Sequence, residues 1–274
     1  MPNLIEVPAS LNFNSIRNRI FRLYAPHLLA ILLIGIVISQ VVSETDNILF
    51  EDILSDLSVS LIFFLVVVMA PIIEEIIFRL PLRPSALSLS IPFSIAILYL
   101  STFLRMNSAI PSVVGFMLLG FNVYLAKRQL KVFRLQQIYR RFSRPIFYLS
   151  AILFGVIHIG NYDSRVWALM PLLVLPQSVL GLFWGFVRVR YGLSWAIFAH
   201  ALHNGCVMAP FLITLGLGSS ELRSQMGQDL SFEALIWLDK LLIIGLGLYF
   251  IGGFILCVVT AWKVIREWQH ASGV

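Results

Sequence analysis

Long runs of apolar residues, separated by short polar or basic segments, extend over most of the chain. Most of these runs are close to the roughly 20 residues that a helix needs to cross the hydrocarbon of a bilayer. The pattern predicts an all-α fold, a polytopic membrane helix bundle of about eight transmembrane helices. The helices are expected at residues 26–43, 58–80, 85–104, 109–126, 146–160, 166–187, 191–214 and 241–262.

The composition agrees with this pattern. Hydrophobic residues make up 59% of the chain and charged residues 12%, and the mean hydropathy is +0.89, which together exclude an ordinary soluble domain. No internal repeat or long linker divides the chain, so we expect one membrane domain. This domain is expected to cover residues 26–262, between a cytoplasmic amino-terminal segment, 1–25, and a cytoplasmic tail, 263–274.

The distribution of basic residues predicts the orientation. If the amino terminus is cytoplasmic and all eight segments span, sixteen of the 20 lysines and arginines lie on the cytoplasmic side. The positive-inside rule therefore favours a multi-pass integral protein of the plasma membrane with both termini in the cytoplasm. The net charge of +6 is then explained by orientation and by contact with anionic lipids, and the lipid bilayer rather than nucleic acid is the expected partner. The densest basic segment, residues 127–145, could be an amphipathic helix on the inner leaflet or an ordinary solvated loop.

Two adjacent glutamates and an arginine interrupt the apolar segment 58–80. Ionisable side chains cost about 2.5–3.5 kcal/mol each on membrane-insertion scales, so they are expected to have partners or a function. Glu75 and Arg79 stand four residues apart on a helix, in the favourable order for an ion pair, whereas Glu74 points about 100° away. The spacing predicts one paired, structural carboxylate and one carboxylate that is free to accept protons. The alternative is that both glutamates lie near the cytoplasmic end, where Arg79 snorkels to the surface and water reaches Glu74.

Two further apolar segments contain polar residues. His158 lies in the segment 146–160, and by itself it could be a hydrogen-bonded structural residue. In the segment 191–214, His200 and Asn204 are four residues apart and share one face. His203 lies on the flank of that face and is the best candidate for polar packing between helices, although its role stays open.

Together these residues could hydrolyse an amide bond inside the membrane. Glu74 could take a proton from water, and His158 could hold that water. His200 and the Asn204 amide could stabilise the oxyanion of the tetrahedral intermediate.

The same residues resemble the motifs of a known family. E-E-I-I-F-R (74–79) resembles EExxxR, F-G-V-I-H (154–158) resembles FxxxH, and H-A-L-H-N (200–204) resembles HxxxN of the CPBP family, the CAAX proteases and bacteriocin-processing enzymes also called Abi proteins. The resemblance covers a motif core of about 70–210. One departure is Leu80 followed by Pro81, where many members have a glycine after the arginine, so the helix is expected to end differently there.

The resemblance implies a function and assigns roles. It implies an intramembrane endopeptidase that cleaves a membrane-associated protein or peptide, such as a prenylated CAAX tail, a bacteriocin leader or an anchored regulator. It implies that Glu74 is the base, that Glu75 and Arg79 support it, that His158 contacts the water or a metal, and that His200 and Asn204 contact the oxyanion or a metal. The family is usually classed with the metalloproteases, and Glu74, His158 and His200 are a plausible zinc ligand set. No HExxH motif is present, and the same residues suit a metal-free mechanism, so the cofactor is either zinc or none.

Two other functions are compatible with parts of the sequence. A proton- or ion-coupled transporter could use the buried Glu, His and Arg groups, with Pro171 and Pro176 breaking a discontinuous helix. No two-fold hydropathy repeat supports this reading. A non-catalytic membrane scaffold would explain the packing motif G-L-F-W-G (181–185), but it would leave the Glu, His and Asn residues without a task.

Overall fold

The computed structural model describes residues 13–38, 57–83, 88, 91–92, 117, 120, 124, 132–224, 233 and 235–272. These residues form helices joined by short turns, which confirms the all-α prediction. The elements are α1 (Phe13–Ile38), α2 (Val59–Phe63), a π-helical segment (Phe64–Met69), α3 (Ala70–Phe78), a 3-10 turn (Leu80–Leu82), α6 (Val132–Ile157), 3-10 turns at His158–Asn161 and Ser164–Leu169, α7 (Met170–Leu173), α8 (Leu175–Tyr191), α9 (Leu193–Leu217), α10 (Ser220–Ser224) and α11 (Trp237–Ser272).

Several of these helices are long and apolar enough to cross a membrane. Five such spans occur in the described part of the chain, and α7 and α8 with the preceding 3-10 turn make a sixth if this pair, bent by 44°, counts as one. They correspond to six of the eight predicted segments, and the protein is an integral membrane protein. The other two predicted segments, 85–104 and 109–126, lie almost entirely outside the described residues. The five spans are Phe13–Ile38, Val59–Leu82, Arg141–Asn161, Leu193–Leu217 and Trp237–Glu267.

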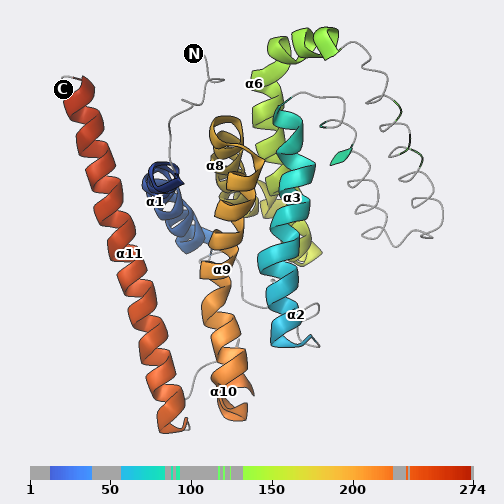
Figure 1. Cartoon of the computed structure of the whole chain (residues 1–274). Helices are drawn as coiled ribbons and strands as arrows, with labels where there is room; N and C mark the ends of the chain where they lie inside the picture. Colours follow the sequence, from blue (N-terminus) through green and yellow to red (C-terminus); the bar gives the residue numbers. More distant parts are fainter. Residues whose placement is uncertain are drawn as a thin grey trace.

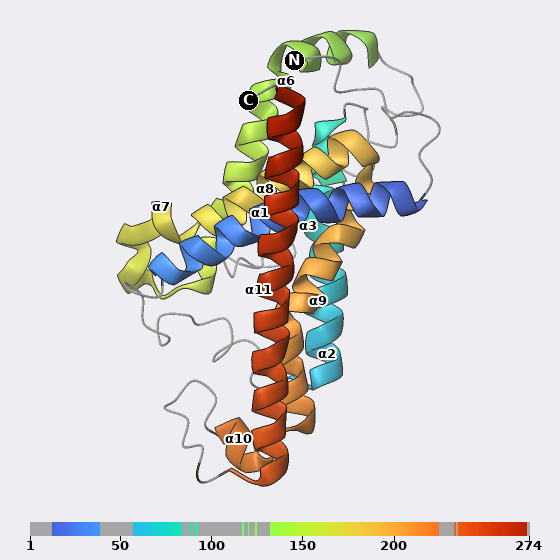
Figure 2. The same cartoon turned by 90° about the vertical axis from the view of Figure 1, so that its left-hand side faces the viewer.

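In Figure 1, α2 with α3 and α11 run in one direction along the bundle, and α6 and α9 run in the opposite direction. Figure 2 shows that α1 and α8 instead run across the bundle. The helix α1 packs against both α8 and α11.

The first helix begins earlier than the apolar pattern predicts. It starts at Phe13, inside the segment 1–25 that was expected to be a cytoplasmic extension. Ile20 of this part is buried in a cluster with Phe183 and Trp184 of α8. The start of α1 therefore packs against the bundle.

Two basic segments are also helical. The helix α6 starts at Val132 in the basic segment 127–145 and continues through Pro145 into the span. In Figure 1 its first turns lie across the end of the bundle before the helix turns along it, and a proline inside a helix favours such a bend. At the other terminus, α11 continues to Ser272, through most of the predicted tail.

Glycines bring α6 and α8 into close contact. A Cβ atom on Gly155 of α6 would lie 2.1 Å from Ser178 Oγ and 2.7 Å from the Val174 carbonyl oxygen. On α8, a Cβ on Gly181 would lie 3.0 Å from the backbone of Ala151. Small residues at such positions allow membrane helices to approach closely. This contact fixes α6 beside α8, and both helices hold the end of α3.

Candidate active site

The helix that carries the two glutamates has a π-helical segment directly before α3. At their junction the Ala70 N–H bonds to the Leu65 carbonyl, one residue further back than in an α-helix. The next carbonyl, that of Val66, then faces Pro71, which has no N–H to donate. Asn204 of α9 supplies the missing donor, since its Nδ2 donates to Val66 O at 2.9 Å. π-helical turns are frequent at functional sites, and this one ties α9 to the helix of the glutamates.

The end of α3 is held by side chains from two other helices. Ser150 Oγ of α6 donates to the Phe78 carbonyl at 2.6 Å. Arg188 Nε of α8 donates to the Arg79 carbonyl at 3.0 Å. The chain then leaves through a 3-10 turn that contains Pro81, so the helix exit at the position where the sequence departs from the family motif is a tight turn.

Glu75 and Arg79 form a buried ion pair. Both side chains are fully buried, and Arg79 Nε lies 3.6 Å from Glu75 Oε1, as the helical spacing predicts. The guanidinium carbon lies 4.1 Å from the centre of the Phe154 ring, in a cation–π arrangement, and Nη2 donates to the Gly181 carbonyl at 3.3 Å. Among the described residues, Glu75 Oε2 and the Nε and Nη1 atoms of Arg79 have no hydrogen-bond partner. Each member of such a pair depends on the other, because removing one leaves an uncompensated buried charge.

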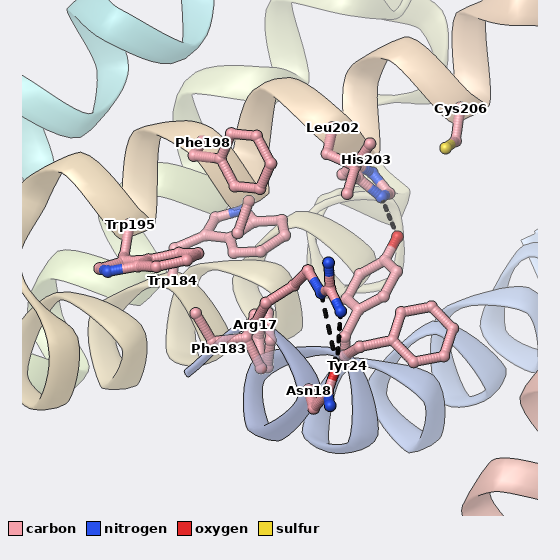
Figure 3. Close-up of a pocket in the computed structure, with 13 residues that line it drawn as sticks. Arg17, Asn18, Tyr24, Phe183, Trp184, Trp195, Phe198, Leu202, His203 and Cys206 are labelled. Carbon is pink, nitrogen blue, oxygen red and sulfur yellow. Dashed lines mark hydrogen bonds between the residues drawn. The ribbon is translucent and has the colours of Figure 1, made fainter. Parts of the chain in front are cut away.

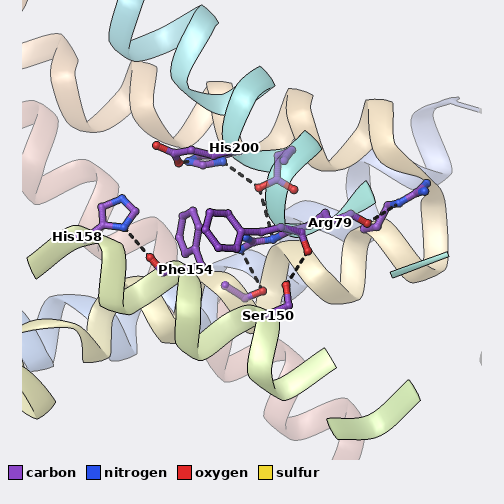
Figure 4. Close-up of polar contacts among 10 residues, drawn as sticks. Arg79, Ser150, Phe154, His158 and His200 are labelled. Atoms are coloured by element: carbon purple, nitrogen blue, oxygen red, sulfur yellow. Dashed lines mark hydrogen bonds and ion pairs between the residues drawn. The ribbon is translucent and has the colours of Figure 1, made fainter. Parts of the chain in front are cut away.

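His200 lies between the two glutamates (Figure 4). Its Nδ1 is 3.0 Å from Glu75 Oε1, and its Nε2 is 3.6 Å from Glu74 Oε2. Because a carboxylate only accepts, the bond to Glu75 places a hydrogen on Nδ1 and leaves Nε2 facing Glu74. The side chain of Glu74 is 20% exposed, whereas that of Glu75 is fully buried. Glu74 is therefore the accessible carboxylate, and Glu75 is the one that orients the imidazole.

His158 is the first residue of the 3-10 turn directly after α6, and the Phe154 ring lies between it and Arg79 (Figure 4). Its Nδ1 donates to the Phe154 carbonyl at 2.7 Å, and the two rings are 4.8 Å apart. Phe154 also contacts His200 edge-on at 5.8 Å. The turn that follows His158 is held by Asp163, whose carboxylate accepts from the Arg165 backbone N–H and pairs with the Arg165 side chain, and these contacts lower the pKa of Asp163.

The predicted site residues are therefore only partly brought together. Glu74, Glu75 and Arg79 form one connected cluster with His200. The amide of Asn204 is adjacent, but its described hydrogen bond goes to the Val66 carbonyl and not toward the carboxylates. Within the described part of the chain, no hydrogen bond or ion pair connects His158 to this cluster.

The same side chains were the predicted metal ligands. His200 and His158 both engage Nδ1, which leaves Nε2 as the donor atom, and this is the usual orientation of metal-bound histidines. However, in the described ranges no group of three or more His, Cys, Asp or Glu side chains is arranged to hold a metal ion. The ligand set of Glu74, His158 and His200 is thus not assembled, and the steps below use only the chain's own groups.

Other residues around the cluster were not predicted from the sequence to belong to the site. Phe154 was visible as the first residue of FxxxH, but the pattern did not indicate that it packs against Arg79. Trp184 is fully buried and stacks on His200, with ring centres 5.4 Å apart and planes inclined by 15°. Ser150 and Arg188 hold the end of α3. The available signal was that Trp184 lies in the apolar segment 166–187 and that Arg188 follows this segment directly, four residues after Trp184.

The chain is a helical membrane protein with two carboxylates and an imidazole between its helices, and ionisable groups inside a membrane usually mark a functional site. A family model described as "Type II CAAX prenyl endopeptidase Rce1-like" matches residues 56–206, which is more than half of the chain. The chain therefore belongs to the Rce1-like family, and membership supports a CAAX-type intramembrane endopeptidase in general. No curated protein and no solved structure matched the chain. The matched range contains all six predicted site residues and excludes α1 and α11.

Proposed function

We propose that this protein hydrolyses a peptide bond of a membrane-associated protein or peptide with a water molecule activated by Glu74. One observation carries the proposal: the imidazole of His200 has Nδ1 fixed by the buried Glu75 and Nε2 directed at the more accessible Glu74. This arrangement supports different tasks for two adjacent carboxylates. Glu75 orients a catalytic imidazole, and Glu74 handles the proton.

The proposed reaction needs one water and no other reactant. Glu74 accepts a proton from the water as its oxygen attacks the scissile carbonyl carbon. His200, in its protonated form, donates from Nε2 to the resulting oxyanion, and the second N–H of the Asn204 amide could add to this stabilisation. Collapse of the intermediate breaks the C–N bond, and Glu74 returns the proton to the leaving nitrogen.

His158 has a separate proposed role in positioning water. Because its Nδ1–H donates to the Phe154 carbonyl, the neutral ring presents a lone pair on Nε2. That atom can accept a hydrogen bond from the attacking water when substrate is bound.

The test compares Glu74→Gln with Glu267→Gln, an exposed glutamate on α11. The reporter is a prenylated CAAX-type peptide in vesicles that contain the purified full-length protein. Glu74→Gln should lower kcat by about 10²–10⁴-fold while the protein stays folded, since a general base is lost without a change of shape. Glu267→Gln should cleave like the wild type.

One outcome of this test would count against the role of Glu74, and another would count against the endopeptidase itself. Glu74→Gln protein that cleaves at the wild-type rate would remove Glu74 from the mechanism. If the wild type does not cleave the reporter, Glu74→Gln protein purified from its own cells should retain its substrate, which mass spectrometry can identify. Failure to retain any cleavable protein or peptide would count against the endopeptidase.

The orientation remains part of the proposal, with both termini, residues 1–25 and the tail 263–274 on the cytoplasmic side of the plasma membrane.

A proton- or ion-coupled transporter is the alternative function. The feature that favours it is the break between α7 and α8, where the helices are bent by 44°. Proton uptake into vesicles that depends on Glu74, without peptide cleavage, would favour this alternative.

A further inference from the structure

Trp184 of α8 contacts the ring that the proposed mechanism depends on. Its indole stacks on His200 with a centre-to-centre distance of 5.4 Å and an angle of 15° between the planes. The side chain is fully buried, and its Nε1 has no hydrogen-bond partner among the described residues. A buried indole usually finds such a partner, so the orientation of Trp184 is explained by its ring contacts rather than by a hydrogen bond.

A second layer of rings holds Trp184 from the direction of α1. Tyr24 of α1 stacks on Trp184 at 5.9 Å and 21°. The hydroxyl of Tyr24 is hydrogen-bonded to His203 Nδ1, and the ring of His203 lies 5.9 Å from Trp184. Figure 3 shows Tyr24, His203 and Trp184 around a pocket of about 270 Å³ between α1, α8 and α9. Trp184 lines this pocket and also stacks on His200, which does not line it.

An imidazole between two carboxylates must be fixed in two ways. The hydrogen bond from His200 Nδ1 to Glu75 fixes the direction in which this nitrogen points. A single hydrogen bond still leaves the plane of the imidazole ring free to tilt about that direction. A parallel indole restricts the tilt, because tilting would lose the stacked contact. Both restraints are needed for Nε2 to remain directed at Glu74.

We propose that Trp184, supported by the hydrogen-bonded pair of Tyr24 and His203, is a positioning residue that fixes the plane of the His200 ring. This inference rests on the proposed function for its effect on the reaction, but its structural effect can be measured without cleavage. It gives His203 a role that the sequence left open. It also makes α1, which lies outside the range matched by the family model, a part of the site through Tyr24.

The first measurement is ¹⁵N NMR of histidine-labelled, full-length protein in detergent micelles. The chain has five histidines, and the His200 signals are assigned by their loss in His200→Gln. The wild type should show one set of His200 ring signals, and Trp184→Leu should show a second or a broadened set. The matched control is Phe183→Leu, because Phe183 is equally buried on the same helix and contacts Tyr24 and Trp184, with no described ring contact to His200.

The second measurement is the kinetics of the prenylated CAAX-type reporter. An aromatic pair contributes about 0.5–1.5 kcal/mol, so Trp184→Leu should lower kcat by about 2- to 10-fold with KM nearly unchanged. Trp184→Phe should recover part of this loss, and Tyr24→Phe should give a smaller loss in the same direction. Phe183→Leu should leave kcat within about 2-fold of the wild type.

The outcomes are distinct from those of the functional test. Unchanged His200 signals in Trp184→Leu would overturn the inference, as would an equal change in Phe183→Leu, since both would indicate general packing only. If Trp184→Leu does not fold, Trp184→Phe decides in its place, and signals identical to the wild type would overturn the inference. If His200→Gln cleaves normally, the proposed function fails, and the NMR comparison still decides the positioning of the ring.

Discussion

The most apolar 18-residue stretches of the span Val59–Leu82 and of α11 have the same mean hydropathy, 2.6, but different surroundings. In the most apolar stretch of the first, 22% of the residues are buried, whereas in α11 the figure is 6%. The first span contains both glutamates and contacts α6, α8 and α9. The second exposes large apolar side chains over most of its length. Hydropathy therefore identifies a membrane helix without telling a site helix from a peripheral one.

The polar residues inside a span distinguish a helix that forms the site from a helix at the periphery of the bundle. Glu75 and Arg79 are too costly to face lipid, so the helix that carries them must turn them toward other helices. In α11 the two acidic residues lie near the ends of the helix: Asp239 is buried and accepts hydrogen bonds from Ser219, and Glu267 pairs with Arg22 of α1 in an exposed contact. The same residue type thus serves two purposes, and matched substitutions in the two regions can measure the difference.

The largest expected difference is between Glu75→Gln and Glu267→Gln. Glu75→Gln leaves the fully buried Arg79 without its counter-charge, and breaking a buried pair from one side costs about 3–5 kcal/mol. Glu267→Gln removes only an exposed pair, which contributes about 0–1 kcal/mol. Unfolding of the purified protein in mild detergent measures both losses. Arg79→Met added to Glu75→Gln should recover part of the first loss, and no recovery would contradict the buried-pair interpretation.

The outcome for these residues also shows what the sequence can predict. The contact of Glu75 with Arg79 was predictable because both residues lie on one helix, where spacing fixes their geometry. The contact of Glu75 with His200 was not, since it depends on how two helices are aligned along their lengths. The same limit applies to Trp184 of α8, which contacts His200 of α9 and Tyr24 of α1.

Helix boundaries show a related limit. Hydropathy located the spans, but α1 begins at Phe13, inside the expected cytoplasmic segment 1–25. The helix α6 begins at Val132, in the basic segment for which an amphipathic helix and a solvated loop were both open. Basic and polar residues are good helix formers when their side chains can reach water or headgroups. The membrane pattern therefore marks the hydrocarbon crossing, while the helix itself continues beyond it.

The contact between α6 and α8 also differs from α11 in how closely the helices pack. A comparison of the stability of Gly155→Ala with that of Gly253→Ala tests this difference. A Cβ on Gly155 would overlap Ser178 Oγ and the Val174 carbonyl, whereas a Cβ on Gly253 of α11 would meet nothing within 4 Å. Gly155→Ala should lose about 1–3 kcal/mol through overpacking between α6 and α8. Gly253→Ala should be neutral or gain up to about 1 kcal/mol, because alanine favours a helix over glycine.

A control separates the two overlaps at Gly155. Adding Ser178→Ala removes the hydroxyl oxygen and leaves the Val174 carbonyl in place, so it should recover only part of the loss. Equal stability of Gly155→Ala and Gly253→Ala would contradict the close approach of α6 to α8 at Gly155. Thermal unfolding of the same purified proteins provides the measurement.

In both regions a proline leaves a backbone carbonyl without its helical N–H donor, and a side chain of a neighbouring helix donates to that carbonyl instead. In α9 the carbonyl of Cys206 would pair with the N–H four residues on, but that residue is Pro210. Tyr249 of α11 donates to this carbonyl at 2.8 Å. The bond from Asn204 to the Val66 carbonyl is the counterpart beside the site, and it is partly buried while the Tyr249 bond is exposed.

The smallest expected effects come from these two bonds, and a second substitution identifies their cause. Asn204→Leu should lose about 0.6–1.5 kcal/mol, and Tyr249→Phe about 0.5 kcal/mol or less. Pro71→Ala restores an N–H that can reach the Val66 carbonyl, so Asn204→Leu should cost less stability in that background. An unchanged cost would mean that Asn204 does not stabilise the protein through this carbonyl. Cleavage should stay low in the double variant even where stability returns, because the second amide N–H proposed for the oxyanion is still missing.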